Sequence, residues 1–281
     1  MSATHNKSVL KSRLAGGQFT ITAEIVPPLA ADPEPLLRRA APLKGIVAAV
    51  NVTDGAGAKT TMSSLAAAAI LAANHFEPVL QMTCRDRNRI ALAGDLLGAA
   101  ALGIVNLLPL FGDDPTHGDQ PEATSVHDLN TLALIRLAKT LRDDSALPSG
   151  RRIEAAPQFF IGAADVLQDP RPEKGFKSLV DKIEAGAEFV QTQFCFDLDL
   201  IRRYIEGLDS RGLLEQVRIL IGVGPISSAR SGQWMRENLW GTAIPDAVIK
   251  RIADAEDEAQ AGRTVCLELM QALHELPGAA G

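Results

Sequence analysis

The stretch EPVLQMTCRDRNRIALAGDLLGAAALGIVNLLPL, residues 77–110, decides the fold class of this chain. An apolar run at 77–84 is followed by a segment of helical period at 86–101 and then by a second apolar run at 103–110. Strands that are apolar along their whole length need cover on both faces, which helices between parallel strands supply. The stretch therefore predicts one strand, helix, strand unit of a parallel sheet.

The same alternation continues outward in both directions along the chain. Five more strands are predicted, at 19–26, 45–52, 157–164, 188–194 and 217–224. The other predicted helices lie at 33–42, 61–74, 128–142, 174–186, 197–209, 228–238, 245–254 and 257–273. With about 30 residues per unit and no break in composition, the pattern favours one (β/α)8 TIM barrel over residues 1–281 rather than two domains.

Only seven strands are found by this reasoning. After the helix at 257–273 the chain reads ELPGAAG (275–281), so the eighth strand of the barrel is expected to be missing or truncated. A doubly wound sheet is the alternative architecture. That fold would use a GxGxxG turn after a strand to bind a dinucleotide, and no predicted strand is followed by one.

The composition argues against several classes of protein. Of 281 residues 46% are hydrophobic, but only 9 Phe, 2 Trp and 1 Tyr occur, so the core must be mainly Ala, Leu, Ile and Val. A net charge of −6 with scattered basic residues gives no footprint for nucleic acid. No signal peptide and no apolar run of about 18 residues are present, which predicts a cytoplasmic protein without a membrane span.

Metal and hydrolase chemistry find no support in the sequence. The three cysteines form no CxxC pair, the five histidines have no metal-ligand partner at helical or strand spacing, and GxSxG is absent. We therefore expect no disulfide framework and no metal site. A small-molecule ligand is the default expectation.

In a barrel of this kind the chemistry lies at the C-terminal ends of the strands. The polar residues at those positions are expected to converge on one mouth; they are Glu24, Thr53 with Asp54, Thr83, Asp113 with Asp114, Asp165 and Gln193. The long acidic loop at 112–128 is of a length that is often functional, although an ordinary solvated loop is the alternative.

Three of these residues suggest particular roles. Partial desolvation of Glu24, just before two prolines, would raise its pKa and suit it to donate a proton; the alternative is a solvent-facing strand end. Asp113 follows Gly112, which would let the backbone approach a ligand closely, although an aspartate is also common in turns. The amide of Gln193 could bind the edge of a heterocycle or only satisfy backbone groups.

Across almost its whole length the sequence resembles methylenetetrahydrofolate reductase, most closely the bacterial branch with a CRDRNR run and a GD loop. The resemblance rests on the order and spacing of six segments. They are AEIVPP (23–28), NVTDGAG (51–57), QMTC through VHDL (81–129), FFIGAAD (159–165), KIEAGAEFVQTQFCFD (182–197) and IGVGPISSAR (221–230).

The resemblance implies a flavoprotein of one-carbon metabolism and methionine biosynthesis. Its barrel would bind FAD, and NADH or NADPH would reduce the flavin before 5,10-methylenetetrahydrofolate is reduced to 5-methyltetrahydrofolate. Glu24 would take the place of the general acid that protonates N10 of the folate. Asp113 would bind the pterin and tune the flavin, and Gln193 would contact the pterin and the nicotinamide.

The resemblance also implies a set of cofactor-binding residues. Carried over by motif, they are Thr53, Asp54, Ala56, Gln81, Thr83, Phe111, Gly112, Asp113, Ser125, Val126, Ala164 and Lys182. The commonly cited bacterial enzymes differ at three of these positions, with Tyr, His and Arg where this chain has Asp54, Gln81 and Phe111. Their FEFFPP also stands where this chain has AEIVPP.

These departures motivate a second hypothesis, a folate-binding subunit that needs a partner protein for its electrons. A pterin-dependent methyltransferase on a similar barrel is a distant third, because the sequence has no Cys or His zinc set. A homo-oligomer is compatible with the sequence. Arg230 is a candidate for binding the glutamate tail of the folate, only because it follows the last predicted strand.

Overall fold

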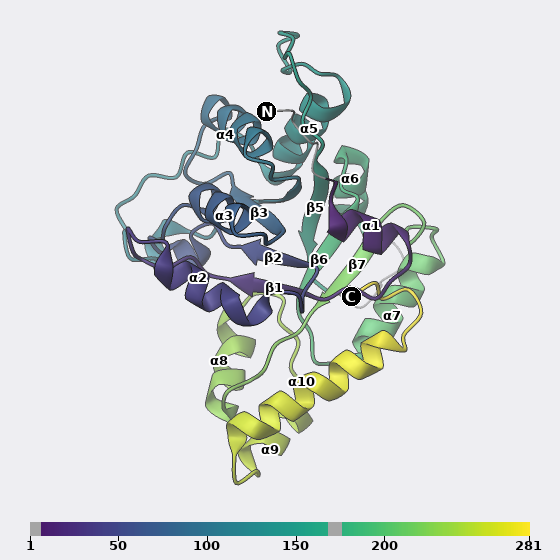
Figure 1. Ribbon diagram of the computed structural model, residues 1–281. Helices are drawn as coiled ribbons and strands as arrows, with labels where there is room; N and C mark the ends of the chain where they lie inside the picture. The colour runs from purple at the N-terminus through teal and green to yellow at the C-terminus, as the bar shows by residue number, and fades with distance from the viewer. Residues whose placement is uncertain (1–6, 168–175) are drawn as a thin grey trace. The chain divides into compact units, whose positions relative to one another are not determined.

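The computed structural model describes residues 7–167 and 176–281 and confirms all seven predicted strands (Figure 1). The strands are ordered along the sheet as they are along the chain. The register determined for neighbouring pairs is parallel throughout. They are β1 (Thr22–Ile25), β2 (Ala49–Val52), β3 (Pro78–Thr83), β4 (Asn106–Leu110), β5 (Phe160–Asp165), β6 (Phe189–Phe194) and β7 (Arg218–Gly222). Parallel strands in chain order, each followed by a helix, are the arrangement of a TIM barrel.

Each helix predicted from the sequence is present within two or three residues of its expected bounds. They are α2 (Glu34–Ala40), α3 (Ser64–Ala73), α4 (Arg89–Ala101), α5 (Thr131–Asp143), α6 (Lys177–Ala185), α7 (Leu198–Asp209), α8 (Ala229–Asn238), α9 (Asp246–Ala253) and α10 (Glu258–His274). Polar N-caps explain several starts, because Ser63, Asn88, Asn130, Asp197 and Ser228 each accept a hydrogen bond from a first-turn backbone N–H.

Several strands begin about three residues later than the apolar runs suggest. Ile104 and Phe159 are fully buried, yet they precede the first residues of β4 and β5. An apolar run indicates which residues are buried, but it does not indicate which of them form hydrogen bonds to a neighbouring strand. Each predicted strand therefore includes buried residues of the turn that precedes it.

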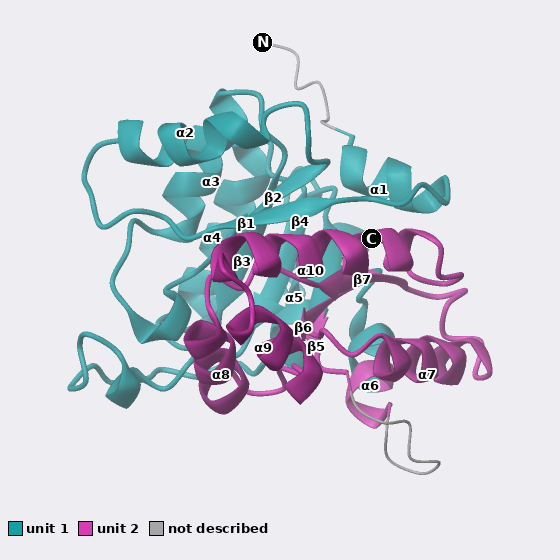
Figure 2. Cartoon of the chain, turned by 90° about the horizontal axis from the view of Figure 1, so that it is seen from below, with its two compact units in different colours: residues 1–163, 181–188 teal, residues 164–180, 189–281 magenta. Residues whose placement is uncertain are grey.

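The chain divides into two compact units (Figure 2). The first comprises Met1–Ala163 and Asp181–Glu188, and the second comprises Ala164–Val180 and Phe189–Gly281. The single domain expected over residues 1–281 stays a prediction.

The core of the first unit is aliphatic, as the composition predicts. Val52, Leu80, Met82 and Ile161 from the strands pack with leucines and alanines of α3, α4 and α5, and Phe159 is the one aromatic residue of this cluster within the described chain. These strand residues face the helices. The alternate residues of the same strands face the other side of the sheet.

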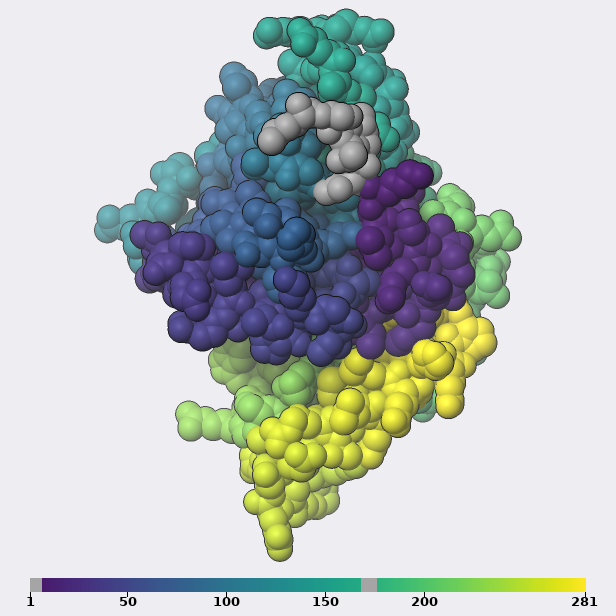
Figure 3. All heavy atoms as spheres, viewed as in Figure 1, coloured from purple at the N-terminus to yellow at the C-terminus, as the bar shows by residue number. Residues whose placement is uncertain are grey.

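A helix that the sequence reasoning did not predict, α1 (Val9–Ala15), covers the N-terminal ends of β3 and β4. Leu10 and Leu14 are fully buried, and the Glu77 carboxylate accepts hydrogen bonds from the backbone N–H groups of Val9 and Leu10, both at 2.8 Å. Asn106 donates to the same carboxylate at 2.8 Å. The helix, drawn in purple, lies at the surface in Figure 3.

In the second unit the last residues of the chain pair with β7. Ala279 forms a parallel bridge with Ile219, Ala280 N–H donates to the Ile219 carbonyl at 2.8 Å, and Ile221 N–H donates to the Gly281 carbonyl at 2.8 Å. Residues 279–281 thus pair with β7 at the place where an eighth strand is expected, and no eighth strand is assigned among the described residues.

The sequence predicts that the protein has no membrane span and no disulfide framework. Among helices in 7–167 and 176–281, none is long and apolar enough to cross a bilayer. Cys84, Cys195 and Cys266 are buried free thiols.

Candidate active site

Three polar residues share one face of β1, β2 and β3. Glu24 lies beside Asn51, and Asn51 lies beside Val79; Gln81, two residues further along β3, projects from the same face. Gln81 Nε2 donates a hydrogen bond to Glu24 Oε2 at 3.0 Å. Asn51 and Gln81 are buried, whereas Glu24 keeps access to solvent at the end of β1.

The Glu24 carboxyl has a perturbed pKa. Desolvation by the surrounding protein raises the pKa above its ordinary value of 4.5, and the Gln81 hydrogen bond opposes this only in part. The group can thus keep a proton at a pH where an ordinary glutamate has lost it, and it can release that proton to a ligand.

Asp54 and Thr83, both predicted to bind cofactor, are bonded to each other. One oxygen of the Asp54 carboxylate accepts from Thr83 N at 2.8 Å and Thr83 Oγ1 at 3.0 Å, and pairs with Arg87. The other oxygen accepts from Ser64 Oγ at 2.9 Å. The carboxylate is therefore engaged within the protein, where it joins the ends of β2 and β3 to the start of α3.

Thr53, unlike Asp54 and Thr83, has a side chain without a hydrogen-bond partner among the described residues. It is buried at the end of β2. A buried hydroxyl without a partner is uncommon in folded proteins. It is an available donor and acceptor at a strand end where a ligand is expected.

Arg85 organises the loops that follow β2 and β4, a role that sequence reasoning missed. Its buried guanidinium binds Asp86 in bidentate fashion at 2.7 and 2.8 Å. The remaining nitrogen donates to the carbonyls of Gly55 at 3.2 Å and Asp113 at 3.4 Å. The signal was the CRDRNR run placed immediately after a strand.

The same two loops are joined directly by aspartates. Asp113 Oδ2 accepts from Gly57 N at 2.7 Å, and Asp119 accepts from Thr60 N at 3.0 Å and from Thr60 Oγ1 at 3.1 Å. Asp113 is exposed, and its second carboxylate oxygen has no hydrogen bond within the described chain. One side chain can thus hold the loop that carries Ala56 and still offer an acceptor to a ligand.

Gly112 is required for a steric reason within the protein itself. Its φ of +101° favours glycine, and a Cβ atom here would lie 2.7 Å from Arg85 Cβ and 3.2 Å from Thr83 Cβ. Glycine is therefore required by the close approach to Thr83, at the end of β3, and to Arg85 just beyond it. The close approach of a ligand to Gly112 stays a prediction.

An aromatic pair lies further along the loop after β4. Phe111 stacks on His127 with ring centroids 4.1 Å apart and an interplanar angle of 8°, and Phe111 remains half-exposed. The neighbouring Val126 is also exposed, and its N–H donates to the Arg85 carbonyl at 2.7 Å. Ser125 is partly buried beside it. The predicted contacts Phe111, Ser125 and Val126 therefore lie on one loop anchored to β3.

Ala164 and Gln193 lie at strand ends in the second unit. Gln193 sits where the pairing of β6 with β7 shifts register between Gln191 and Phe194, and such bulges re-aim side chains near active sites. Its Oε1 accepts from Phe194 N at 2.9 Å. At the end of β5, Asp165 accepts a hydrogen bond from the buried Tyr204 hydroxyl at 2.7 Å.

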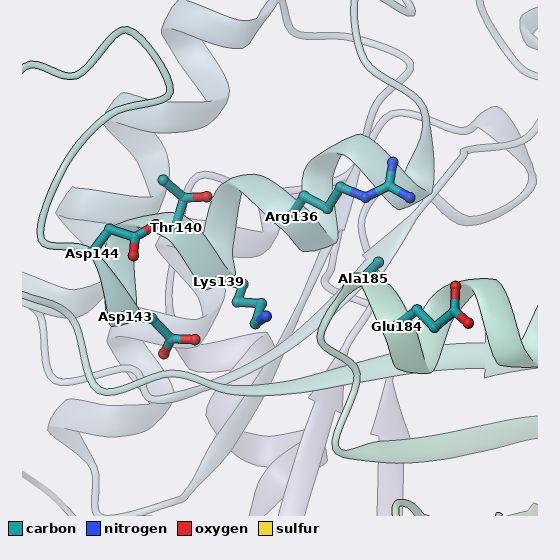
Figure 4. Close-up of a pocket in the computed structure, with 7 residues that line it drawn as sticks. All are labelled: Arg136, Lys139, Thr140, Asp143, Asp144, Glu184 and Ala185. Atoms are coloured by element: carbon teal, nitrogen blue, oxygen red, sulfur yellow. The ribbon is translucent and has the colours of Figure 1, made fainter.

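Lys182 and a surface hollow lie on the helices. Lys182 is in the last turn of α6. This turn precedes the start of β6 in the chain and does not follow directly after the end of a strand. A hollow of about 290 Å³ lies between α5 and the end of α6, lined by residues of both signs such as Arg136, Asp143 and Glu184 (Figure 4). It contains none of the predicted site residues. In the described chain no cluster of three or more His, Cys, Asp or Glu could hold a metal ion.

Comparisons with known proteins match this chain to one family. A family model described as "Methylenetetrahydrofolate reductase" matches residues 9–276. The chain is 26% identical to "Methylenetetrahydrofolate reductase 2" of Schizosaccharomyces pombe over 78% of its own length but only 34% of that protein. It is 24% identical to "5,10-methylenetetrahydrofolate reductase" of Pectobacterium carotovorum subsp. carotovorum, covering 92% of this chain and 82% of that one.

Among solved structures, an uncharacterized protein from Clostridium thermocellum superposes with a TM-score of 0.64 at 12% identity. The match covers 95% of this chain and 88% of that one. That protein is described as binding two copies of 5-methyl-5,6,7,8-tetrahydrofolic acid. At this level of identity the likeness shows the fold.

Proposed function

Because the chain belongs to the methylenetetrahydrofolate reductase family, we propose that it reduces 5,10-methylenetetrahydrofolate to 5-methyltetrahydrofolate with FAD and NADH or NADPH. The chain spans about a third of the length of the fission-yeast relative but most of the bacterial one. The bacterial match supports an activity contained in a chain of this size.

The observation that carries the proposal is the raised pKa of Glu24 at the end of β1. Opening the five-membered ring of the folate requires a proton on N10, and an acid whose pKa is raised above that of an ordinary glutamate is better suited to supply it. Desolvation raises the pKa of Glu24, and the hydrogen bond from Gln81 orients the carboxyl at the end of β1. Glu24 is therefore assigned as the general acid.

The strand ends of the first unit fit a flavin in several respects. Thr53 offers a buried hydroxyl without a partner in the described chain, and Phe111 and Val126 expose apolar surface on the anchored loop after β4. When bound and reduced by NADH or NADPH, the flavin would supply the hydride. The residues of the first unit proposed to hold it are Thr53, Asp54, Ala56, Gln81, Thr83, Phe111, Gly112, Asp113, Ser125, Val126 and Lys182. Ala164, in the second unit, is proposed on the resemblance to the family alone. Since the Asp54 and Thr83 side chains bind each other, their contribution would come from their backbone or through the loop shape they maintain.

The folate is proposed to be held by polar groups that complement the acid. Asp113 keeps one carboxylate oxygen for the pterin while the other holds the loop after β2. Gln193 supplies an amide from the bulge at the end of β6. A carboxylate matches the donors on the edge of a pterin, and an amide can match either a donor or an acceptor there.

The test compares the two half-reactions of wild type and Glu24→Gln. Protein reconstituted with FAD is mixed first with NADPH or NADH to follow flavin bleaching, and then with methylenetetrahydrofolate to follow reoxidation. We expect folate-dependent reoxidation to slow at least about 100-fold in the variant, because the proton donor is lost. Flavin reduction should stay close to wild type, since hydride transfer to the flavin needs no acid from Glu24.

Glu34→Gln, an exposed acid in the first turn of α2, is the matched control and should leave both half-reactions unchanged. Equal slowing of both half-reactions by Glu24→Gln would indicate a structural role for Glu24. Failure of wild type to bind flavin and to turn over folate would overturn the proposed reductase activity.

A second candidate function is a folate-binding subunit that receives electrons through a partner protein. The engagement of Asp54 by Thr83, Ser64 and Arg87 favours it, because this carboxylate is not free to contact a flavin. Tight folate binding without NADPH oxidation, with activity restored by a co-purifying protein, would select this candidate.

A further inference from the structure

Trp240 is the most exposed large aromatic residue in the described chain. It is one of two tryptophans in a protein that has few aromatic residues, and 78% of its surface is accessible. It lies in the connection between α8 and α9, in the second unit. A single exposed apolar side chain is ordinary on a protein surface. Whether Trp240 has a function therefore depends on which residues lie beside it.

The connection that carries Trp240 is fixed against the ends of β5 and β6. Gly241 has a φ of +80°, and a Cβ there would lie 2.3 Å from Val166 Cγ1, just beyond β5. Ala243 N donates to the Phe194 carbonyl at 3.0 Å, and Phe196 N donates to the Ala243 carbonyl at 2.7 Å. These bonds make a short parallel bridge that extends β6. The indole is thus carried by backbone held at two strand ends.

Trp240 is also bonded to a residue proposed to bind folate. Gln193 Nε2 donates to the Trp240 carbonyl at 3.4 Å, while Gln193 Oε1 accepts from Phe194 N. The amide of Gln193 therefore connects the bulge of β6 to the backbone of Trp240. In the same connection the Thr242 hydroxyl is buried without a hydrogen-bond partner among the described residues.

We infer that Trp240 is a ring-stacking residue whose indole packs against a planar ring of the folate held by Gln193. The inference rests on the proposed function, since it concerns the same substrate and a neighbour of the same binding residue. An exposed indole on rigid backbone offers a large flat surface with little conformational entropy to lose on binding. The pterin and aminobenzoyl rings of a folate are the flat partners that such a surface fits.

The two tryptophans make the inference directly testable by fluorescence. Trp234→Phe leaves Trp240 as the only tryptophan, and Trp240→Phe leaves only Trp234, which is 55% exposed on α8. The proteins are titrated with 5-methyltetrahydrofolate and, separately, with NADPH, with correction for ligand absorbance. We expect the folate to quench emission in wild type and Trp234→Phe, and to leave Trp240→Phe unchanged.

Calorimetry with the same folate measures affinity. Trp240→Ala should weaken binding about tenfold through loss of stacking, while Trp240→Phe should recover part of the loss because it keeps a ring. Trp234→Ala is the matched control and should bind as wild type does. Because Trp240 is exposed, the alanine variant is expected to fold, which its circular dichroism and unfolding temperature check.

Three results would overturn the inference while leaving the proposed function intact. They are unchanged folate affinity in Trp240→Ala, quenching by NADPH but not by folate in Trp234→Phe, and an oligomer in wild type that Trp240→Ala dissociates. If wild type binds no 5-methyltetrahydrofolate at all, the proposed function itself fails, and the stacking role fails with it.

Discussion

At the scale of single residues, Glu24 combines two properties that compete with each other. It is reachable from solvent, as a proton donor must be, yet desolvation raises its pKa. The sequence predicted the raised pKa from the apolar neighbours and the two prolines that follow, and the structure confirms its direction. What the sequence did not show is Gln81, whose hydrogen bond favours the ionised form and limits the shift.

The raised pKa of Glu24 predicts a pH-dependent cost to stability. Between the unfolded and folded pKa values the native state binds more protons than the unfolded state, so stability falls as pH rises through this window. Glu24→Gln removes that loss. We therefore expect the variant to unfold at a higher temperature than wild type near pH 8, and the difference to shrink toward pH 4.

Thermal unfolding followed by circular dichroism across that pH range measures the effect without any ligand. Superimposable pH profiles for wild type and Glu24→Gln would show that the carboxyl titrates alike in the folded and unfolded states. That result would remove the physical basis for assigning Glu24 as the acid.

At the scale of secondary-structure elements, Asp54 joins parts of the chain that meet at the strand ends. It follows β2, bonds both the backbone and the hydroxyl of Thr83 on β3, accepts from Ser64 at the start of α3, and pairs with Arg87 just before α4. The loops on which the proposed flavin and folate contacts depend are held in part by this one carboxylate.

Removing the Asp54 carboxylate should therefore destabilise the first unit. We expect Asp54→Ala to lower the free energy of unfolding by about 3–5 kcal/mol, because the mostly buried Arg87 guanidinium loses its main partner. Asp95 also contacts Arg87, at 3.3 Å and closer to solvent, so Asp95→Ala should cost about 1 kcal/mol or less.

Urea denaturation of the two variants measures both free-energy differences under identical conditions. Equal losses would mean that the two carboxylates are interchangeable partners of Arg87. That outcome would contradict a central role for Asp54 in joining the strand ends.

At the scale of the whole molecule, the strand order confirms a TIM-barrel fold with seven assigned strands. The last residues, 279–281, pair with β7 where an eighth strand is expected. Gly278 makes the turn before them with a φ of +90°. The pairing shields one edge of β7 from solvent, and an open edge is otherwise a place where strands add.

We predict that this terminal pairing contributes to the stability of the second unit. Ala280→Pro removes the N–H that donates to Ile219 and should lower the free energy of unfolding by about 1–2 kcal/mol. Ala280→Ser keeps the donor and should stay close to wild type. Hydrogen exchange at Ile221, whose N–H donates to Gly281, reports the same pairing locally; unchanged exchange in Ala280→Pro would mean that the terminus frays in the native protein.

The sequence alone determined the order and type of nearly every element. Apolar runs of β-branched residues alternate with helical periodicity because each parallel strand must be covered by the helix that follows it. The short helix α1 was missed, because seven helical residues with two buried leucines carry too little periodicity to be recognised. Its position depends on Glu77 and Asn106, about 70 and 100 residues further along the chain.

The sequence also determined which residue types stand at the strand ends, since the end of each strand can be read from its pattern. Only the tertiary structure decided which other residues of the protein they contact. It showed that Asp54 faces Thr83 and Arg87, that Gly112 makes room for Arg85, and that Trp240 is held beside Gln193. A side chain's role depends on its neighbours in space, and at the ends of parallel strands these come from loops far apart in the sequence.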